Sequence, residues 1–218
     1  DDGRVATRTL GAADAGVLES RADNLVMSNG AQIFAGIGKA VTDGSVEGFT
    51  EGIGNGGDMS LAITDLVSIS GQSIDGFQSG LFSSAQIGQG NAGNLHLTAG
   101  QVTLSGGAVI SSSTVSVGQG GELSMQVSGD ISVSGGVNSR NRSGIFSLSN
   151  SSGRGGNLRI EAGGTLRMDD GRVATRTLGA ADAGVLEIRA DNLVMSNGAQ
   201  IFAGIGNAFT DGSVKGIA

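Results

Sequence analysis

Apolar residues along this chain fall into short alternating pairs, and each pair follows a glycine. The glycines are Gly16, Gly57, Gly93, Gly121, Gly156 and Gly184. The pairs at spacing two are Leu18/Ser20, Met59/Leu61, Leu95/Leu97, Leu123/Met125, Leu158/Ile160 and Leu186/Ile188. A second pair follows each of them: Leu25/Met27, Val67/Ile69, Val102/Leu104, Ile131/Val133, Leu166/Met168 and Leu193/Met195. Alternate side chains of a β-strand face opposite sides, so the pattern predicts two short strands in every unit.

A glycine bend and one further aliphatic residue complete most units. The bends read SNGAQI, SGQSI, SGGAVI and DDGRV, and the aliphatic residues expected to close the core are Ile33, Ile74, Ile110, Val173 and Ile201. We expect glycine to supply left-handed backbone where the chain turns from one face to the next. Unit lengths differ, and we expect nearly all of that variation between the last aliphatic residue and the next glycine.

These strands are too short to form a stable hairpin sheet alone. Stacked coil on coil, each strand would pair in parallel with its equivalent in the next unit, and the inward Leu, Ile, Val and Met would form continuous columns. The sequence therefore predicts an all-β fold, a parallel β-helix (β-solenoid) of about six and a half coils without a globular core. A helix over GAADAGVLESRADNL is an alternative, because its residues are good helix formers, although Gly16 interrupts it. A β-sandwich or antiparallel meander is the other, but neither needs repeating registers.

A long exact repeat supports the stacked arrangement. Residues 1–48 return as residues 169–216 with four differences, which are Ser20/Ile188, Lys39/Asn207, Val41/Phe209 and Glu47/Lys215. Like units meet only their neighbours in a stack, so we interpret residues 1–218 as one continuous solenoid segment of a longer array. Its near-identical repeats are 1–50 and 169–218, at a period of 168 residues. Its units are 17–57, 58–93, 94–121, 122–156, 157–184 and 185–218.

Composition narrows the remaining choices. Glycine contributes 41 residues, proline and cysteine none, and aromatic residues only 3%, so the core must be thin and aliphatic. Without cysteine there is neither a disulfide framework nor a thiolate metal site. No apolar run is long enough to span a membrane. The net charge of −7 and the expected lack of a basic, aromatic-lined groove argue against nucleic acid as a partner.

The units GNAGNLHLTAGQVTLSGGAVISSSTVSVGQGGELSMQVSG and GRGGNLRIEAGGTLRM resemble filamentous-haemagglutinin-like repeats. Such repeats occur in large exoproteins of Gram-negative bacteria and cyanobacteria, many of them exported by two-partner secretion. The resemblance covers essentially the whole chain. It implies a right-handed β-helical shaft, secreted or bound at the cell surface, that serves adhesion, a matrix or a filament.

The polar residues give few candidates for chemistry. His96 is the single histidine and lies between Leu95 and Leu97, so we expect it to face outward without a catalytic partner. Asp169 and Asp170, like Asp1 and Asp2, are expected at a solvated bend that is copied with the repeat. Arg140 and Arg142 form a local basic cluster that we interpret as a solvated loop, with contact to an anionic glycan as the alternative.

Motifs for ions, phosphate and glycosylation are weak. Asp43-Gly44, Asp75-Gly76 and Asp211-Gly212 look like turns rather than calcium loops. GIGNGG and GQGNAG lack the Lys and Ser/Thr of a phosphate-binding loop, so we expect connections between coils. Asn141-Arg142-Ser143 and Asn150-Ser151-Ser152 are N-x-S sequons. We therefore predict no catalytic, cofactor-binding or metal-binding residue and no cofactor.

Two classes of function stay open. The first is a structural shaft of a secreted or surface-exposed bacterial adhesin or extracellular filament. The second is a carbohydrate-active lyase or hydrolase built on a β-helix. The repeat favours the first, because a spacer tolerates duplication whereas selection on one site diversifies the coils. We expect both chain ends to fall within a unit and to carry no cap, so the expected partners are further copies or adjoining repeats, end to end. Glycans or surfaces are further expected partners.

Overall fold

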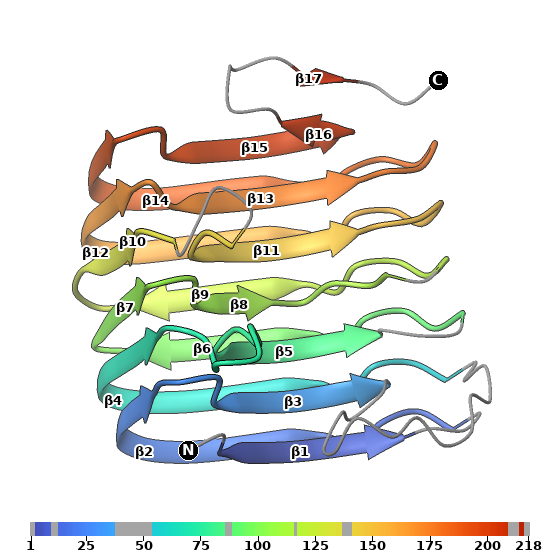
Figure 1. Ribbon diagram of the computed structural model, residues 1–218, viewed down its shortest axis with the longest axis horizontal. Coiled ribbons are helices and arrows are strands. Elements are labelled where there is room, and N and C mark those ends of the chain that lie inside the picture. The colour runs from blue at the N-terminus through green and yellow to red at the C-terminus, as the bar shows by residue number, and fades with distance from the viewer. Residues whose placement is uncertain are drawn as a thin grey trace.

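The computed structural model describes residues 3–9, 13–37, 54–85, 89–115, 117–136, 141–208 and 214–215. In these residues the chain is all-β, and fifteen strands run parallel in two sheets that face each other (Figure 1). The seven-strand sheet contains β1 (Arg4–Thr9), β3 (Gln32–Ile37), β5 (Gly80–Ala85), β8 (Val109–Ser111), β11 (Gly144–Ser149), β13 (Arg172–Thr177) and β15 (Gln200–Ile205), in that order.

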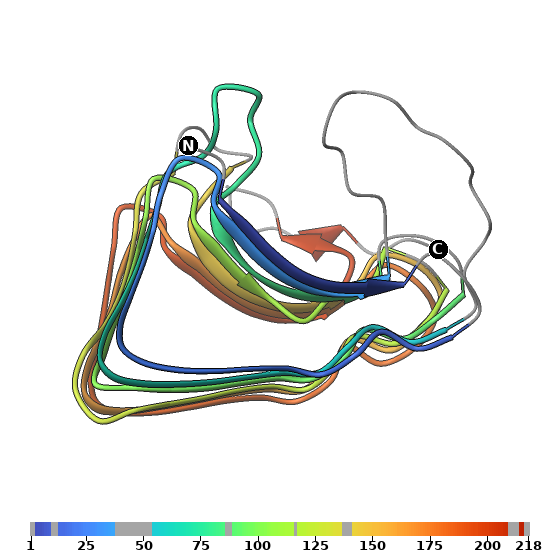
Figure 2. The same cartoon turned by 90° about the horizontal axis from the view of Figure 1, so that it is seen from below.

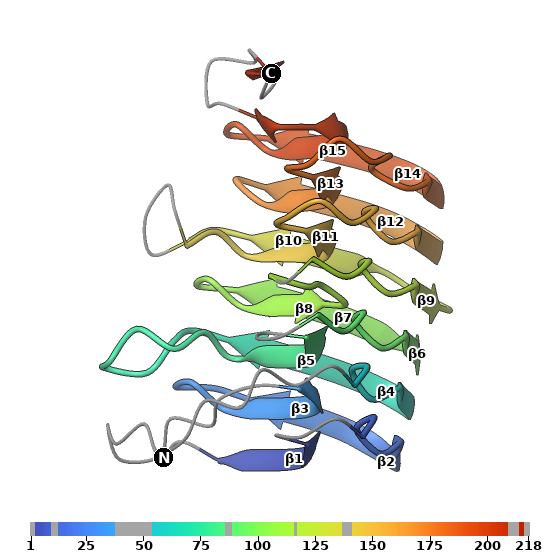
Figure 3. The ribbon, with the colours of Figure 1, turned by 90° about the vertical axis from the view of Figure 1, so that its right-hand side faces the viewer.

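The eight-strand sheet contains β2 (Leu18–Met27), β4 (Met59–Ser70), β6 (Leu95–Ala99), β7 (Gln101–Ser105), β9 (Leu123–Val127), β10 (Ile131–Ser134), β12 (Leu158–Asp169) and β14 (Leu186–Ser196). A small antiparallel pair, β16 (Asn207–Ala208) with β17 (Val214–Lys215), follows. Figure 3 shows the chain rising along one axis, so that strands from successive units lie directly above one another. This architecture is consistent with a β-solenoid, and β2 occupies the stretch where a helix was the alternative.

The register of the eight-strand sheet matches the predicted pairs. One row joins Leu18, Met59, Leu95, Leu123, Leu158 and Leu186 across neighbouring strands. A second row joins Leu25, Val67, Val102, Ile131, Leu166 and Leu193. The register shifts after Ala22 in β2 and after Ala162 in β12, which lets each long strand turn a corner (Figure 2). The predicted parallel pairing of each strand with its equivalent is thus confirmed.

The aliphatic column of the seven-strand sheet differs from prediction at one residue. Its members are Val5, Ile33, Leu81, Ile110, Ile145, Val173 and Ile201. The prediction that Ile74 closes the core is wrong, because its side chain is fully exposed in a turn between Ser73 and Phe77. Leu81, seven residues later, is completely buried in its place.

The prediction about unit length is also wrong in part. Some variation does lie between the seven-strand sheet and the following strand of the eight-strand sheet. However, Gly71–Ser79 and Gly135–Ser143 are long connections on the opposite corner, where β12 and β13 are joined by only Asp170 and Gly171. Each long connection ends in a buried serine. The hydroxyl of Ser79 donates to the Ser70 carbonyl and that of Ser143 to the Ser134 carbonyl, which closes both excursions in the same way.

Toward the carboxyl ends of the strands in the seven-strand sheet, the interior is polar and narrow. Buried hydroxyls there donate to the carbonyl of the glycine that precedes a strand, in the pairs Ser83–Gly57, Ser112–Gly93 and Ser147–Gly121. Burying a hydroxyl without a partner is costly, so these bonds make the Ser-rich half of the core possible. The aliphatic columns fill the other half.

Glycines serve two separate purposes. Gly30, Gly71, Gly106 and Gly198 have positive φ at the bends, as predicted, and Asp170 adopts the same conformation at φ 57. The glycines before the strands of the eight-strand sheet are needed for a different reason. A Cβ on Gly121 would lie 2.0 Å from the carbonyl oxygen of Gly93, and one on Gly156 would meet the Gly121 oxygen even closer. The backbones stack too tightly there for any side chain.

A candidate binding face on the seven-strand sheet

His96 lies where the sequence placed it. It is on the outer face of β6, half-exposed, between Ser60 of β4 and Ser124 of β9. Within the described residues no group of three or more His, Cys, Asp or Glu side chains comes together.

Asp169 and Asp170 lie at the predicted bend between β12 and β13. Asp169 Oδ1 accepts hydrogen bonds from Ser196 Oγ at 3.1 Å and from Asn197 Nδ2 at 2.5 Å. Asp170 Oδ1 is 3.1 Å from Arg142 Nη2. The bend is therefore confirmed, and its carboxylates link neighbouring coils in addition to meeting solvent. Asp1 and Asp2 lie outside the described residues.

The interpretation of Arg142 as part of a solvated loop is wrong. Its side chain is only 11% exposed, it pairs with Asp170, and its Nη1 donates to the carbonyl of Gly198 at 3.0 Å. Arg142 lies just before β11 and fastens this part of the chain to the next two coils. Arg140 lies outside the described residues.

The loops that resemble ion or phosphate sites use their amides internally. Asn55 N–H donates to Asp14 Oδ1, Asn91 N–H to Asn55 Oδ1, and Gln119 N–H to Asn91 Oδ1. This ladder of side chains occupies amides of GIGNGG and GQGNAG that would otherwise face an anion. Asp75-Gly76 forms the predicted turn, with the Gly76 N–H donating to the Ser73 carbonyl. Asp43-Gly44 and Asp211-Gly212 lie outside the described residues.

The outer face of the seven-strand sheet has a composition unlike the rest of the chain. Side chains alternate with the buried column, which places the following on the outside: Arg4, Ala6, Arg8, Gln32, Phe34, Gly80, Phe82, Ser84, Ser111, Phe146, Leu148, Arg172, Ala174, Arg176, Gln200 and Phe202. None of these is acidic, although acidic residues outnumber basic ones by 20 to 13 in the whole chain. The sheet is also concave on this side (Figure 2).

Phenylalanines on this face lie over glycines of the same strand. A Cβ on Gly144 would strike the ring of Phe146, and one on Gly80 would come within 2.9 Å of the ring of Phe82. Gly204 has the same relation to the Phe202 ring, at 3.0 Å. The absent side chain lets each ring lie down along its strand, so the outer face presents aromatic surfaces instead of upright rings.

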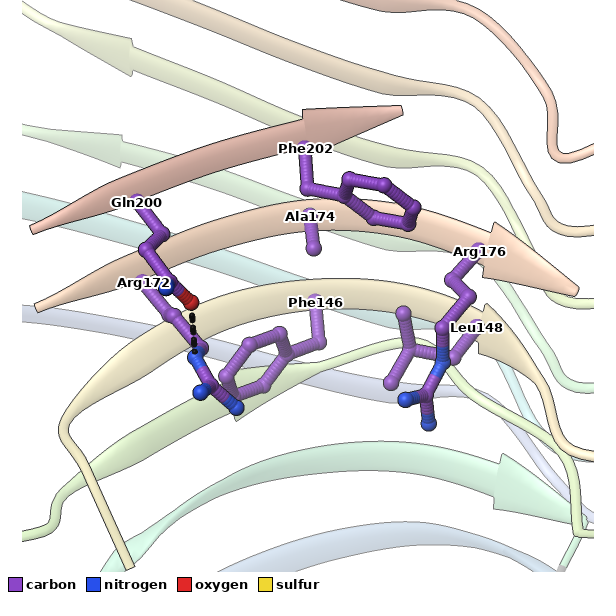
Figure 4. A pocket seen from close by; sticks show the side chains of 7 residues that line it. All are labelled: Phe146, Leu148, Arg172, Ala174, Arg176, Gln200 and Phe202. Atoms are coloured by element: carbon purple, nitrogen blue, oxygen red, sulfur yellow. Dashed lines mark hydrogen bonds between the residues drawn. The ribbon is translucent and has the colours of Figure 1, made fainter. Parts of the chain in front are cut away.

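Three strands of this face enclose a shallow trough (Figure 4). Phe146 of β11, Ala174 of β13 and Phe202 of β15 occupy one row, and Ala174 forms the floor between the two rings. Leu148, Arg172, Arg176 and Gln200 complete the lining. Because neighbouring strands are ~4.8 Å apart, the backbones that carry the two phenylalanines are about 10 Å apart.

Arg172 and Arg176 place two guanidinium groups along the trough. Arg172 Nε donates to Gln200 Oε1 at 2.8 Å, its single side-chain hydrogen bond among the described residues. Arg176 Nη2 donates to Asn150 Oδ1 at 2.9 Å. Asn150 belongs to one sequon, and Asn141 of the other is 3.4 Å from Gln72 Oε1. Both arginines are half-buried.

Burial lowers the pKa of Arg172 and of Arg176 below the usual arginine value. The positive charge of Arg142 lowers the pKa of Arg172 further, while Asp170 raises it, and the charge of Arg172 lowers the pKa of Arg176. Both groups remain cationic, since arginine ionises far above neutral pH. The trough therefore combines positive charge, aromatic rings and no carboxylate. The expectation that the chain lacks a basic, aromatic-lined surface is wrong for this face.

Sequence reasoning missed the trough because it followed inward residues. The signal was present as Gly-x-Phe in Gly80–Phe82 and Gly144–Phe146, and as Phe-x-Gly in Phe34–Gly36 and Phe202–Gly204. In a strand both members of such a pair share one face, where glycine leaves room for the ring. Arg172, Ala174 and Arg176 alternate with buried residues in the same manner.

Comparisons with known protein families, with curated proteins and with solved structures found no match to this chain. The part of the chain that the structure describes contains no helix that could span a membrane. The function must therefore be argued from the repeat and from the outer faces.

Proposed function

We propose that this chain is part of the structural shaft of a secreted or surface-exposed bacterial adhesin or extracellular filament, in which it acts as a repetitive β-helical spacer or fibre. One observation carries the proposal. The two copies of the repeated segment occupy equivalent places on one axis, with β1 and β13 in the same row of the seven-strand sheet. Duplication of a segment in such a stack lengthens the shaft without creating a new shape.

Finer features belong to the same proposal. We take the solenoid to be right-handed, in keeping with the strong preference for right-handed connections between parallel strands, and to contain about six and a half coils. Its partners are adjoining repeats or further copies, end to end, together with glycans or surfaces, and nucleic acid is not among them. Its location is extracellular or on the outer bacterial surface, as the resemblance to filamentous-haemagglutinin-like repeats implies.

The alternative, a carbohydrate-active enzyme, has less support. A glycosidase commonly uses a pair of carboxylates across the bond to be broken. The outward positions of the seven-strand sheet named above include no acidic residue. On the eight-strand sheet, Glu161 and Glu187 form ion pairs with Arg159 and Arg189. We therefore propose no catalytic role for these residues.

Chains that carry extra 168-residue periods test the shaft. Five strand spacings of ~4.8 Å make one period about 24 Å long, so each added period should lengthen the particle by about that amount in electron micrographs or small-angle scattering. A matched chain lengthened by an unrelated globular domain of equal size should gain a separate lobe. If the added periods also form separate lobes, the shaft proposal fails.

A further inference from the structure

We propose that the tip of the long connection Gly71–Ser79 binds in the trough of a second copy of this chain, and that this contact is reciprocal. Ile74 at the tip of one copy packs on Ala174, the floor of the other copy's trough. Asp75 of the same tip meets Arg172 at the rim. The inference goes beyond the proposed function, because it concerns shafts that pair side by side and requires no particular length of shaft.

Hydrogen bonds along its own length hold the connection in one shape. Gln72 and Gln78 form an antiparallel bridge across it. The Ser73 N–H donates to the Phe77 carbonyl at 2.8 Å, and the Ser73 hydroxyl accepts from the Phe77 N–H at 3.1 Å. The Gly76 N–H closes the turn by donating to the Ser73 carbonyl at 3.0 Å. A segment that is ordered before it binds loses less conformational entropy on binding, so the tip is prepared for a contact.

The tip displays one large apolar side chain and one acid. Ile74 is fully exposed, more than any other large apolar side chain in the described part of the chain, and Asp75 beside it is exposed as well. Single exposed apolar residues are common on protein surfaces, but this one stands on an ordered turn. Figure 2 shows the connection projecting beyond the seven-strand sheet on its concave side. The tip therefore faces any molecule that approaches this side of the shaft.

The trough offers an apolar surface for such a side chain. Ala174 forms its floor, and the rings of Phe146 and Phe202 lie along the strands on either side (Figure 4). An aliphatic side chain that enters there meets a methyl group below it and aromatic rings at its sides. Burial of an exposed isoleucine against these groups removes apolar surface of both copies from water.

The charges of the two surfaces are opposite. The outward positions of the seven-strand sheet named above include no acidic residue, whereas the turn Ser73–Phe77 contains Asp75 and no basic residue. Arg172 donates through Nε to Gln200 Oε1, which leaves its two Nη atoms for a carboxylate. A guanidinium and a carboxylate form a charge-assisted hydrogen bond. Like charges repel, so this arrangement favours the tip against the trough over trough against trough.

One chain carries both halves of the contact on the same side of the shaft. The connection leads into β5, and β13, the middle strand of the trough, follows β5, β8 and β11 in the sheet. If a second shaft lies antiparallel against this side, related by a two-fold axis across the shafts, the tip of each copy faces the trough of the other. Two identical contacts then form together, and the second costs no further translational freedom. This reciprocity offsets the small area of a single tip.

An added strand is a poorer occupant of the trough. Peptides that dock on sheets usually pair with a free edge through backbone hydrogen bonds. β13 is already paired on both sides, with β11 and with β15, so its backbone groups are used. A contact there must be made by side chains, and the tip of a turn supplies side chains without a need for backbone partners.

Sedimentation equilibrium of the full chain and of Ile74→Ser tests the apolar part of the contact. We expect the full chain to dimerise and Ile74→Ser to dimerise at least about tenfold more weakly. Val26→Ser is the matched control, because Val26 is 71% exposed on the eight-strand sheet, and its dimerisation should be unchanged. A chain that stays monomeric up to about 1 mM would overturn the proposal and leave the trough to a partner of other chemistry. Equal weakening by Val26→Ser would also reject it.

Two charge reversals test which residues meet. Asp75→Arg alone and Arg172→Glu alone each place like charges in both contacts of the pair, so each should dimerise at least about tenfold more weakly than the parent chain. An equal mixture of the two variants pairs opposite charges in both contacts, and we expect dimers of one variant with the other to form again. Failure of the mixture to associate would overturn the proposal.

Asp65→Arg is the control for net charge, because it makes the same change at an exposed residue of β4. By itself it should dimerise like the parent chain, and mixing it with Arg172→Glu should not restore the parent's affinity. Restoration by Asp65→Arg would mean that net charge alone drives association, and the contact would be rejected.

Circular dichroism and thermal unfolding of each variant show whether a substitution disturbs the fold. Ile74 and Asp75 are exposed in the turn, so their variants remain decisive even if Arg172→Glu does not fold. Association end to end would be the same in the parent chain and in every variant, and such a result would overturn the lateral contact. The lengthening of the shaft with added periods does not depend on these outcomes, so the two proposals can fail separately.

Discussion

Residues 4–37 and 172–205 have the same sequence apart from Ser20 and Ile188, yet their surroundings differ. We refer to them as the first and the second copy. Val5 in β1 is 58% exposed, whereas its counterpart Val173 in β13 is completely buried. The difference in exposure reverses at the next strand of the same sheet in each copy, where Ile37 in β3 is buried and Ile205 in β15 is 43% exposed.

Neighbouring strands account for this reversal. β13 lies between β11 and β15, and β3 lies between β1 and β5, while β1 and β15 each have one partner in their sheet. A side chain in these columns is covered by the equivalent residues above and below it. Burial in this fold is therefore conferred by the stack, and one sequence gives a core residue or an exposed residue according to its neighbours.

Gly16 and Gly184 should give the largest difference between the copies. A Cβ at Gly16 would have only the Thr7 Cβ, 4.0 Å away, as a neighbour, whereas at Gly184 it would lie 2.4 Å from the Gly156 carbonyl oxygen at a φ of +91°. Strained backbone and overpacking together make Gly184→Ala destabilising by about 4 kcal/mol. Gly16→Ala should change stability by less than about 1 kcal/mol.

Urea unfolding followed by circular dichroism gives both values, and hydrogen exchange of the amides in β12 and β14 shows whether the damage is local. Midpoints close to that of the parent chain for both variants would mean that the close stacking at Gly184 does not constrain the folded chain. A loss in Gly16→Ala as large as in Gly184→Ala would contradict the assignment of open space to the first copy.

Inward aliphatic residues of β1, β3, β13 and β15 should give the next largest effect. The copy that loses more stability is the second one for the valines and the first one for the isoleucines. Val173→Ala should cost about 2 kcal/mol and Ile37→Ala about 3 kcal/mol, because each removes buried methyl groups and leaves a cavity. Val5→Ala and Ile205→Ala, at the same sequence positions in the other copy, should each cost less than about 1 kcal/mol. Unfolding midpoints of the four variants measure this. If both variants of one copy were always the milder pair, that copy would simply be less ordered, and neighbours would not be the cause.

Periodicity predicted the interior of this fold well, because inward residues at spacing two are constrained by both neighbours in a stack. It failed at Ile74, since SGQSI reads like SNGAQI and apolar pattern alone cannot distinguish Ile74 from Leu81. The difference lies in contacts that the sequence does not display. The Ser73 hydroxyl accepts from the Phe77 N–H to hold the turn, and the Ser79 hydroxyl accepts from the Gly30 N–H of the neighbouring coil.

The candidate site was harder to predict than the core. Arg172, Phe146 and Phe202 come from three strands far apart in sequence, and outward positions have no required residue type. Their meeting depends on the register, which aligns Phe146 with Ala174 and Ala174 with Phe202. The first copy has the same Arg-x-Ala-x-Arg strand. There, however, the Arg4 guanidinium lies 5.6 Å from the centre of the ring of Phe77, which belongs to the long connection Gly71–Ser79. Identical outward residues thus acquire different neighbours.

Ser20 and Ile188 are the one position at which the copies differ in sequence. Ser20 pairs with Leu61 in a row that is otherwise apolar, and it is exposed. Ser20→Ile gives the first copy the residue of the second and extends this apolar row by one side chain next to Leu61, with a gain of about 1 kcal/mol. A urea midpoint that falls or stays unchanged would contradict this, and Ile188→Ser, the reverse change in β14, is the matched control, expected to lose a similar amount.

The smallest effect concerns charges on the outer face of the eight-strand sheet. In the second copy Glu187 and Arg189 face Arg159 and Glu161 of β12, and the four side chains form a closed set of ion pairs. In the first copy the equivalent Glu19 and Arg21 face Ser60 and Ala62 of β4. The hydrogen bond from Arg159 has the largest effect and lowers the pKa of Glu161. Burial raises this pKa by a smaller amount, and the charges of Arg159 and Arg189, each with a still smaller effect, lower it.

A carboxyl group whose pKa is lower in the folded chain stabilises it above the pKa of the unfolded chain, and this stabilisation is lost as the pH falls through the folded value. Glu161→Gln should therefore reduce the urea midpoint slightly at neutral pH, and the gap from the parent chain should close below about pH 4. Glu19→Gln is the control, since Glu19 has no ion pair among the described residues, and it should show no such gap. Salt should reduce the effect of Glu161→Gln, because exposed pairs are screened. A gap that persists in acid would mean that Glu161 acts through packing, and the two outer faces of the copies would then differ in shape instead of charge.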